Sequence, residues 1–134
     1  MKNSRSDVSF LAIPVLRLGG SALMLIHGIS KLEMLLSGEK IDFYNFMGLG
    51  EEISLILAVI GELLAPLLLL AGLQTRAAAF VAAFTMAVAA FGAHAGDSLE
   101  DREHSLLYLV LFISLMISGG GKWSADEFLR RRKS

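Results

Sequence analysis

The stretch that decides the fold is residues 53–74, which read ISLILAVIGELLAPLLLLAGLQ. Glu62 is the only ionisable side chain in it. A membrane-spanning helix needs about 20 mostly apolar residues, whereas spanning strands are about half as long and alternate polar with apolar residues. The stretch therefore predicts a helix that crosses a membrane.

Three other apolar runs have the same character. Together the predicted helices cover about 9–31, 53–74, 77–95 and 104–119. The first run is not typical of a cleaved signal peptide, because Arg17 interrupts it and no A-x-A-like site follows, so we expect it to be retained. We predict an all-α membrane protein in which the single domain 1–134 forms an antiparallel bundle of four transmembrane helices.

The composition supports this class. Of the 134 residues, 54% are apolar and 19% are charged, against about 45–50% and about 25% in average soluble proteins. A soluble domain of this size buries only about two-thirds of its surface, and disorder needs low hydrophobicity. The chain has no cysteine, which excludes disulfides, thiolate metal sites and c-type haem. A net charge of −1 indicates no nucleic-acid partner.

The distribution of Lys and Arg predicts the orientation. With both termini on one side, that side carries eight of these residues and the other side three. They are Lys2, Arg5, Arg76, Lys122, Arg130, Arg131, Arg132 and Lys133 on the first side, and Lys31, Lys40 and Arg102 on the other. Cytoplasmic loops are enriched in Lys and Arg, so we expect cytoplasmic termini, with the basic tail 122–134 contacting anionic lipid.

The connection 32–52 is then an outer loop. Its apolar residues make it amphipathic, which is typical of a segment on the membrane interface. They are Ile41, Phe43, Tyr44, Phe46, Met47 and Leu49. Two interpretations stay open for this loop: a hydrophobic connector, or a lid over a site below it.

Polar and small residues of the first helix recur at steps of three and four, which places them on one face. They are Arg17, Gly20, Met24, His27, Gly28 and Lys31. Charges within a membrane are costly and find partners in the protein interior. Counting residues along the helices puts Arg17 and Glu62 at a similar depth, so we predict an ion pair between them. This pair would either fix helix packing or leave Glu62 to exchange protons or hold a polar ligand.

Further titratable residues fall near the outer helix ends. They are His27, Lys31, His94 and Glu103. Imidazoles and a carboxylate are ligands for a divalent metal, but they also relay protons, and a third interpretation places each residue alone in headgroup water. We predict Glu62 and His27 as proton-handling residues, Arg17, Lys31, His94 and Glu103 as binding residues, and no metal site.

Several motifs together carry a family resemblance. They are Leu16-Arg17-Leu18, His27-Gly28 with Lys31-Leu32, Gly61-Glu62, Gly72-Leu73-Gln74-Thr75-Arg76, Ala93-His94, Glu103 and Gly119-Gly120-Gly121-Lys122-Trp123-Ser124-Ala125-Asp126. In their order and spacing, over about residues 10–129, they resemble the DoxX family of small four-helix membrane proteins. The chain departs from that pattern where Pro is missing before Trp123 and where Ala125 replaces Leu. Either Glu100 or Glu103 matches the family's acidic position, and Glu103 is favoured because the apolar run starts directly after it.

The resemblance implies a protein of the bacterial or archaeal cytoplasmic membrane with a link to redox processes. Members are similar to a subunit of an archaeal thiosulfate:quinone oxidoreductase, and others are associated with oxidative-stress complexes. We predict a redox-associated subunit that binds a quinone or another polar-headed ligand. A non-catalytic assembly subunit of an oxidoreductase complex and a small transporter are the alternatives. Catalysis by this chain and self-association stay open, since it has no motif for an electron-carrying cofactor.

Overall fold

The computed structural model describes residues 8–134, so Lys2 and Arg5 lie outside the described residues. Within 8–134 the regular structure is helical and contains no strand, which confirms the all-α class. The elements are η1 (Ser9–Leu11), α1 (Ala12–Leu36), η2 (Phe46–Gly48), α2 (Glu51–Val59), η3 (Ile60–Leu64), α3 (Ala65–Ala71), α4 (Thr75–Val88), η4 (Ala89–Ala93), α5 (Leu99–Ser118) and α6 (Ala125–Lys133).

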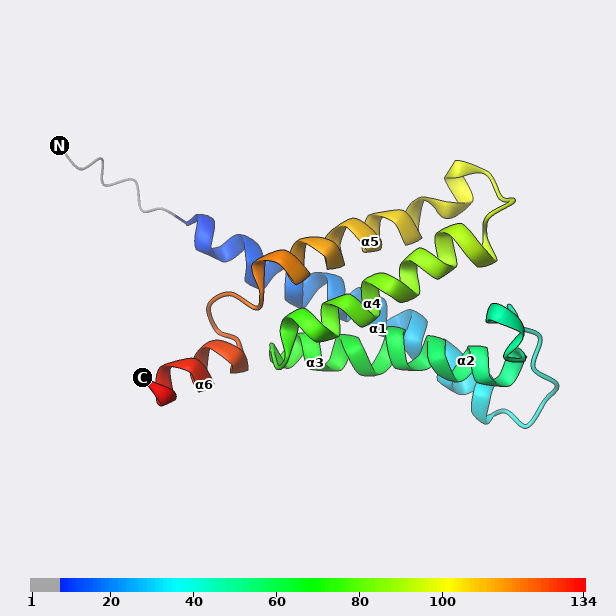
Figure 1. Cartoon of the computed structure of the whole chain (residues 1–134), viewed down its shortest axis with the longest axis horizontal. Coiled ribbons are helices and arrows are strands. Elements are labelled where there is room, and N and C mark those ends of the chain that lie inside the picture. The colour runs from blue at the N-terminus through cyan, green and yellow to red at the C-terminus, as the bar shows by residue number, and fades with distance from the viewer. Residues whose placement is uncertain (1–7) are drawn as a thin grey trace.

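The long helical stretches of the described residues run alternately in opposite directions (Figure 1). They are α1, the continuous stretch α2–η3–α3, the stretch α4–η4, and α5. The two ends of these helices carry different segments of the chain. The start of α1, the turn between α3 and α4, and α6 lie at one end, which we call the terminal end. The connection before α2 and the turn before α5 lie at the other, which we call the loop end.

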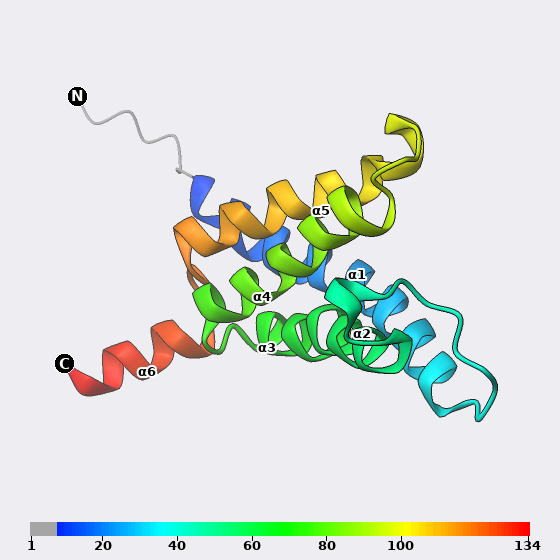
Figure 2. The same cartoon turned by 45° about the vertical axis from the view of Figure 1, so that its right-hand side comes forward.

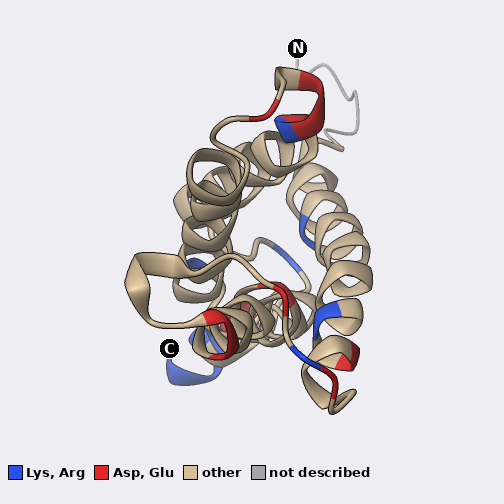
Figure 3. Ribbon diagram, turned by 90° about the vertical axis from the view of Figure 1, so that its right-hand side faces the viewer, with Lys and Arg blue, Asp and Glu red and all other residues tan. Residues whose placement is uncertain are grey.

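Three helical stretches in the described part of the chain are long and apolar enough to cross a membrane. They are Ser9–Leu36, Glu51–Ala71 and Thr75–Ala93. Their outer faces carry exposed apolar side chains such as Val15, Leu18 and Phe80, and Figure 3 shows few charged residues along them. The helix α5 is not among the three spans, because its first turns are charged from Glu100 to Glu103. A multi-pass membrane protein is therefore supported.

The helix boundaries differ from the predicted ones by two or three residues in the second and third helices, and by more at two places. The first helix continues to Leu36, so the connection to α2 spans only 37–50. The fourth helix begins at Leu99, because the Ser98 Oγ accepts a hydrogen bond from the Asp101 N–H at 3.3 Å and caps the helix. The basic tail also contains a helix that we did not predict, α6, whose start is capped by Ser124.

Small side chains set the packing at the centre. The buried core contains four alanines of α4 between larger residues of α1, α3 and α5. Its members are Met24, Ala65, Leu69, Ala78, Ala79, Ala82, Ala83, Met86, Phe112 and Leu115. Small residues let transmembrane helices approach closely. Gly20 does the same on α1, where a Cβ would lie 2.6 Å from the Leu111 side chain of α5.

Two long helices contain a π-helical turn, η3 and η4. The first ends two residues before Pro66, which has no N–H to donate to the preceding turn. Glu62 lies at the centre of this wider turn. Single π-helical turns are frequent at functional sites. Here η3 lies at the middle of the stretch Glu51–Ala71, and η4 ends the stretch Thr75–Ala93 near the loop end (Figure 2).

Candidate functional site

The described part of the chain contains two clusters of buried polar groups, one at each end. At the terminal end, Arg17 is 1% exposed. Its guanidinium donates to four backbone carbonyls. These are the carbonyls of Leu69 and Leu70 at 2.8 Å each, Gly120 at 3.1 Å and Trp123 at 3.2 Å. The first two belong to the last turn of α3, where cations are favoured, and the Leu69 carbonyl also accepts from the Gly72 N–H at 3.0 Å. Arg17 therefore ties α1 to the end of α3 and to the segment after α5.

The predicted Arg17–Glu62 ion pair is wrong. Arg17 binds backbone oxygens at the terminal end, and Glu62 pairs with Lys31. The physical reason is that side chains lean toward the N-terminus of their own helix. Because the two helices are antiparallel, Arg17 leans toward the terminal end and Glu62 toward the loop end. Although counting along the helices places Arg17 and Glu62 at a similar depth, their charged groups therefore lie apart.

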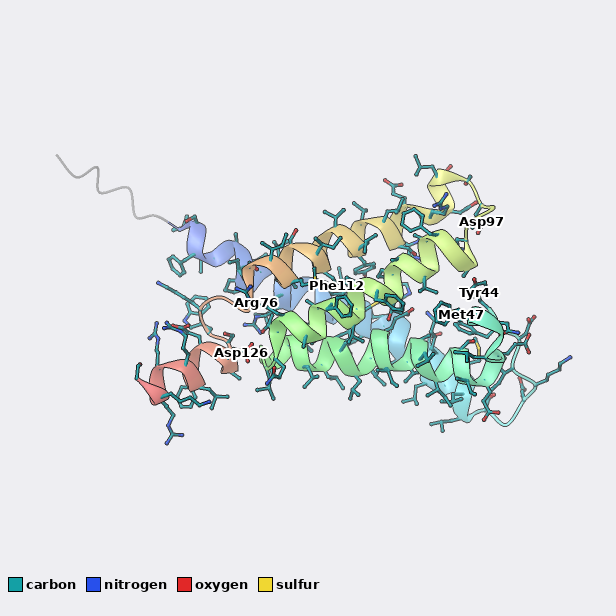
Figure 4. All side chains as sticks on the ribbon, viewed as in Figure 1. Tyr44, Met47, Arg76, Asp97, Phe112 and Asp126 are labelled. Carbon is teal, nitrogen blue, oxygen red and sulfur yellow. The ribbon has the colours of Figure 1, made fainter. Side chains whose placement is uncertain are left out.

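Asp126 extends the terminal-end cluster. Its carboxylate accepts hydrogen bonds at 2.8 Å from the N–H groups of both Gln74 and Thr75, and so caps the start of α4 from a distant part of the chain. Partial burial opposes ionisation, but the bonds from Thr75 and Gln74 and the nearby Arg17 outweigh it and hold the pKa of Asp126 below its usual value. The motifs 72–76 and 119–126 thus form one structural unit. Figure 4 shows Asp126 with Arg76 at this end.

The second cluster centres on Lys31 and Glu62. The Lys31 Nζ and the Glu62 Oε2 lie 2.5 Å apart, and the side chains are 23% and 5% exposed. Lys31 lies near the end of α1 and leans toward its N-terminus, whereas Glu62 leans the opposite way along the antiparallel helix. The same geometry that separates Arg17 from Glu62 therefore brings Lys31 to it.

Two glycines allow the turn that carries Glu62 to fit between its neighbours. A Cβ on Gly28 of α1 would clash with the backbone carbonyl oxygen of Glu62. A Cβ on Gly61 would clash with the Thr85 side chain of α4. The backbone at η3 is thus held closely between α1 and α4. Glu62 is fixed by tertiary contacts on both sides of the turn.

A cavity of about 270 Å³ begins at the ion pair. Its walls come from α2, η3, α4 and η4, and the connection 37–50 covers one end. Most lining residues are apolar; the polar ones are Lys31, Tyr44, Ser54, Glu62, Thr85 and His94. Figure 4 places Tyr44 at the loop end, and its hydroxyl would lie 2.9 Å from a Cβ on Gly92 of η4. A mostly apolar pocket with a few converging polar groups is typical of a small-molecule site.

A smaller cavity of about 60 Å³ lies on the other side of the ion pair. Lys31, Glu62 and His94 line both cavities, and His27, His104, Ser105 and Tyr108 are found only in the smaller one. The ring of His104 stacks on that of His27, with centroids 6.0 Å apart, and lies 6.4 Å from that of His94. The cavity is large enough for water, which needs about 10–15 Å³ per molecule. Polar groups thus lead from buried Glu62 to the exposed rings of His27 and His104.

The predicted site residues therefore separate into three groups. The structure brings His27, Lys31, Glu62 and His94 together around the two cavities. Arg17 belongs to the other end of the molecule. Glu103, predicted as a binding residue, is exposed and lines neither cavity, so the structure does not bring it to this cluster. Its neighbour His104 is there instead.

Sequence reasoning missed His104 and Tyr108. The signal that could have found them is their spacing, since His104 and Tyr108 lie four residues apart and so share a face of α5. The Asp97 carboxylate accepts a hydrogen bond from the His94 Nδ1 at 2.7 Å, which fixes the His94 ring (Asp97 is labelled in Figure 4). Between residues 8 and 134, no group of three or more His, Asp or Glu side chains is arranged to hold a metal ion.

Comparison with known proteins gives one match. The sequence model of the DoxX family matches residues 12–95, which are 84 of the 134 residues. The match contains both π-helical turns and the Lys31–Glu62 pair, but ends before α5. No curated protein and no solved structure matches the chain.

Proposed function

The chain belongs to the DoxX family, and we propose that it binds a small molecule with a hydrogen-bonding head, such as a quinone or quinol, at the Lys31–Glu62 pair. The observation that carries this proposal is the position of the pair. A nearly buried carboxylate and an ammonium group form one end of a mostly apolar cavity. A lipid-soluble ring with oxygen substituents matches both the charged end of this cavity and its apolar walls.

The two charged groups offer complementary hydrogen bonds. The Lys31 ammonium donates to a carbonyl oxygen, while the Glu62 carboxylate accepts from a hydroxyl group. A quinone has carbonyl oxygens, and a quinol has hydroxyl groups. In a poorly solvated cavity such charge-assisted bonds are roughly twice as strong as neutral ones. The pair would therefore bind either form, and Glu62 would take the proton of a bound hydroxyl.

The smaller cavity supplies a route for that proton. Water in it would connect Glu62 to His27, His104 and Tyr108, and imidazoles exchange protons near neutral pH. Because His27 and His104 are exposed, the route ends at the protein surface. Glu62 and His27 keep the proton-handling roles predicted for them, with His104 as an added member.

We further propose that the chain crosses the membrane four times. The apolar part of α5 packs along α4 with buried Phe112 and Leu115, and this places it in the same layer as the three spans. The excess of Lys and Arg at the terminal end then puts the termini in the cytoplasm of a bacterial or archaeal cell. The candidate site lies near the outer surface of its cytoplasmic membrane.

Electrons must come from elsewhere if the ligand changes its redox state. The chain has no motif for an electron-carrying cofactor, so it would act as a subunit beside an oxidoreductase partner. An assembly subunit without a ligand is the competing proposal. The adjoining cavities favour a ligand over a role confined to packing.

Binding of a tailless benzoquinone to the full chain in detergent micelles tests the proposal. Glu62→Gln should weaken binding at least tenfold, because the neutral amide loses the charge-assisted bond. Glu103→Gln is the matched control, since Glu103 is exposed and lines neither cavity, and it should bind as the wild type does.

Two outcomes would contradict the proposal. Equal binding by Glu62→Gln and the wild type would remove Glu62 from the site. If Glu62→Gln does not accumulate in the membrane, the double variant Lys31→Met with Glu62→Met replaces it, because removing both charges leaves no unpaired group. Benzoquinone binding by this double variant would leave the ion pair as a packing element of an assembly subunit.

A further inference from the structure

The stretches α2–η3–α3 and α4–η4 form a V. They meet at the tight turn after α3 and diverge toward the loop end, as Figures 1 and 2 show. The connection 37–50 closes the wide end. The Phe46 ring lies edge-on to that of Phe84 with centroids 6.3 Å apart, and the Phe46 N–H donates to the Ser54 Oγ at 2.8 Å. Direct access from the aqueous side is therefore covered.

The larger cavity lies between the two arms of this V and opens at its side. The wall residues on that side are apolar and partly exposed at the surface of the protein. They are Leu57 (42% exposed), Ile60 (39%), Phe80 (57%), Val81 (38%) and Phe84 (53%). All five belong to two of the candidate spans, Glu51–Ala71 and Thr75–Ala93. This side opening therefore faces hydrocarbon, not water.

The size of the cavity limits what it can hold. Its volume of about 270 Å³ is slightly below the range of about 300–1,000 Å³ that is usual for sites that bury drug-sized ligands. A single ring with its oxygen substituents fits, but a long chain attached to that ring does not. Any such chain has to leave through the side opening, along Leu57, Phe80 and Phe84.

We infer that the ligand reaches the Lys31–Glu62 pair from within the bilayer, between the two arms of the V, and that it is an amphiphile. Its head lies at the pair, and its apolar chain lies over Leu57, Phe80 and Phe84 in contact with lipid. This inference rests on the proposed function and narrows its ligand class to lipid-dissolved molecules. Water-soluble solutes of the outer medium are excluded as the ligand.

The test uses the full chain in lipid nanodiscs and a benzoquinone whose decyl chain ends in a diazirine. After irradiation, mass spectrometry of peptides locates the end of the chain. We expect labelling of the α2 and α4 residues around the side opening, and competition by the tailless ring. Val81→Trp, which fills the opening, should reduce the labelling at least tenfold. Leu67→Trp is the control, because Leu67 is a 47% exposed residue of α3 that lines neither cavity.

The outcomes separate this inference from the proposed function. If the tailless ring binds but the label falls in the connection 37–50 or on α5, access from the bilayer between α2 and α4 is wrong and the proposed function stands. Labelling that is unchanged in Val81→Trp likewise overturns the route alone. If the tailless ring neither binds nor competes, the proposed function fails and the inference fails with it.

Discussion

The two ends of the molecule use buried charge in different ways. At the terminal end, the guanidinium of Arg17 is surrounded by backbone carbonyls that need donors, and it lines neither of the cavities at the ion pair. At the loop end, Lys31 and Glu62 have each other and a cavity on both sides. A buried charge whose bonds all go to the protein stabilises the fold. A buried ion pair that borders a cavity can also bind a ligand.

Among the variants that test this difference between the two ends, we expect Arg17→Met to have the largest effect on stability. It removes a donor from four backbone carbonyls, of which that of Leu69 keeps its bond from the Gly72 N–H, so we expect a loss of about 3–5 kcal/mol in the free energy of unfolding in micelles. Arg76→Met, at an exposed arginine of the same end, should cost less than about 0.5 kcal/mol. Equal losses of stability in the two variants would show that Arg17 does not hold α1 to α3 and to the segment after α5.

Gly28→Ala should have the next largest effect. Its Cβ would clash with the Glu62 carbonyl, so either α1 or η3 must shift, at a cost of about 1–3 kcal/mol in stability. The shift should also weaken benzoquinone binding. Gly19→Ala is the matched control, since a Cβ there meets nothing within 4 Å and Ala favours a helix. The comparison fails if Gly28→Ala is as stable as Gly19→Ala and binds equally well.

Asp126→Asn should cost about 1 kcal/mol, as the loss of a helix cap usually does. Because the pKa of Asp126 is lowered in the folded protein, its contribution is complete above the unfolded value of about 3.9 and is lost as the pH falls through the folded pKa. Thermal stability of the wild type, measured from pH 6 to pH 3, should therefore fall more steeply in acid than that of Asp126→Asn. Parallel curves would contradict this role.

The smallest effect on stability is expected for Lys31→Met combined with Glu62→Met. Replacing a buried ion pair by apolar side chains of similar volume is often neutral, so we expect less than about 1 kcal/mol of change in the free energy of unfolding. Benzoquinone binding should be lost. A large drop in stability without a change in binding would make the loop-end pair equivalent to Arg17 and remove the contrast between the ends.

The basic tail provides a third use of charge, at the surface. In α6 the Glu127 carboxylate accepts hydrogen bonds from Arg130 and Arg131, which lower the pKa of Glu127 to about 2. Glu127 therefore stays ionised and offsets part of the positive charge of the helix. The exposed Phe128 and Leu129 accompany these charges, a combination typical of helices on a membrane interface. The predicted lipid contact of the tail stays a prediction, now for a helix.

Sequence alone determined the local features. Apolar runs near 20 residues predicted the helical class and four spans, three of which the structure supports, because hydrocarbon requires every backbone group to be bonded within the helix. The three-and-four spacing gave the face of α1 on which Arg17, Gly28 and Lys31 lie. Tertiary structure alone decided the partners. Pairing depends on which way each side chain leans and on how closely two backbones approach, and neither is encoded in the spacing along one helix. That is why Glu62 binds Lys31 and not Arg17.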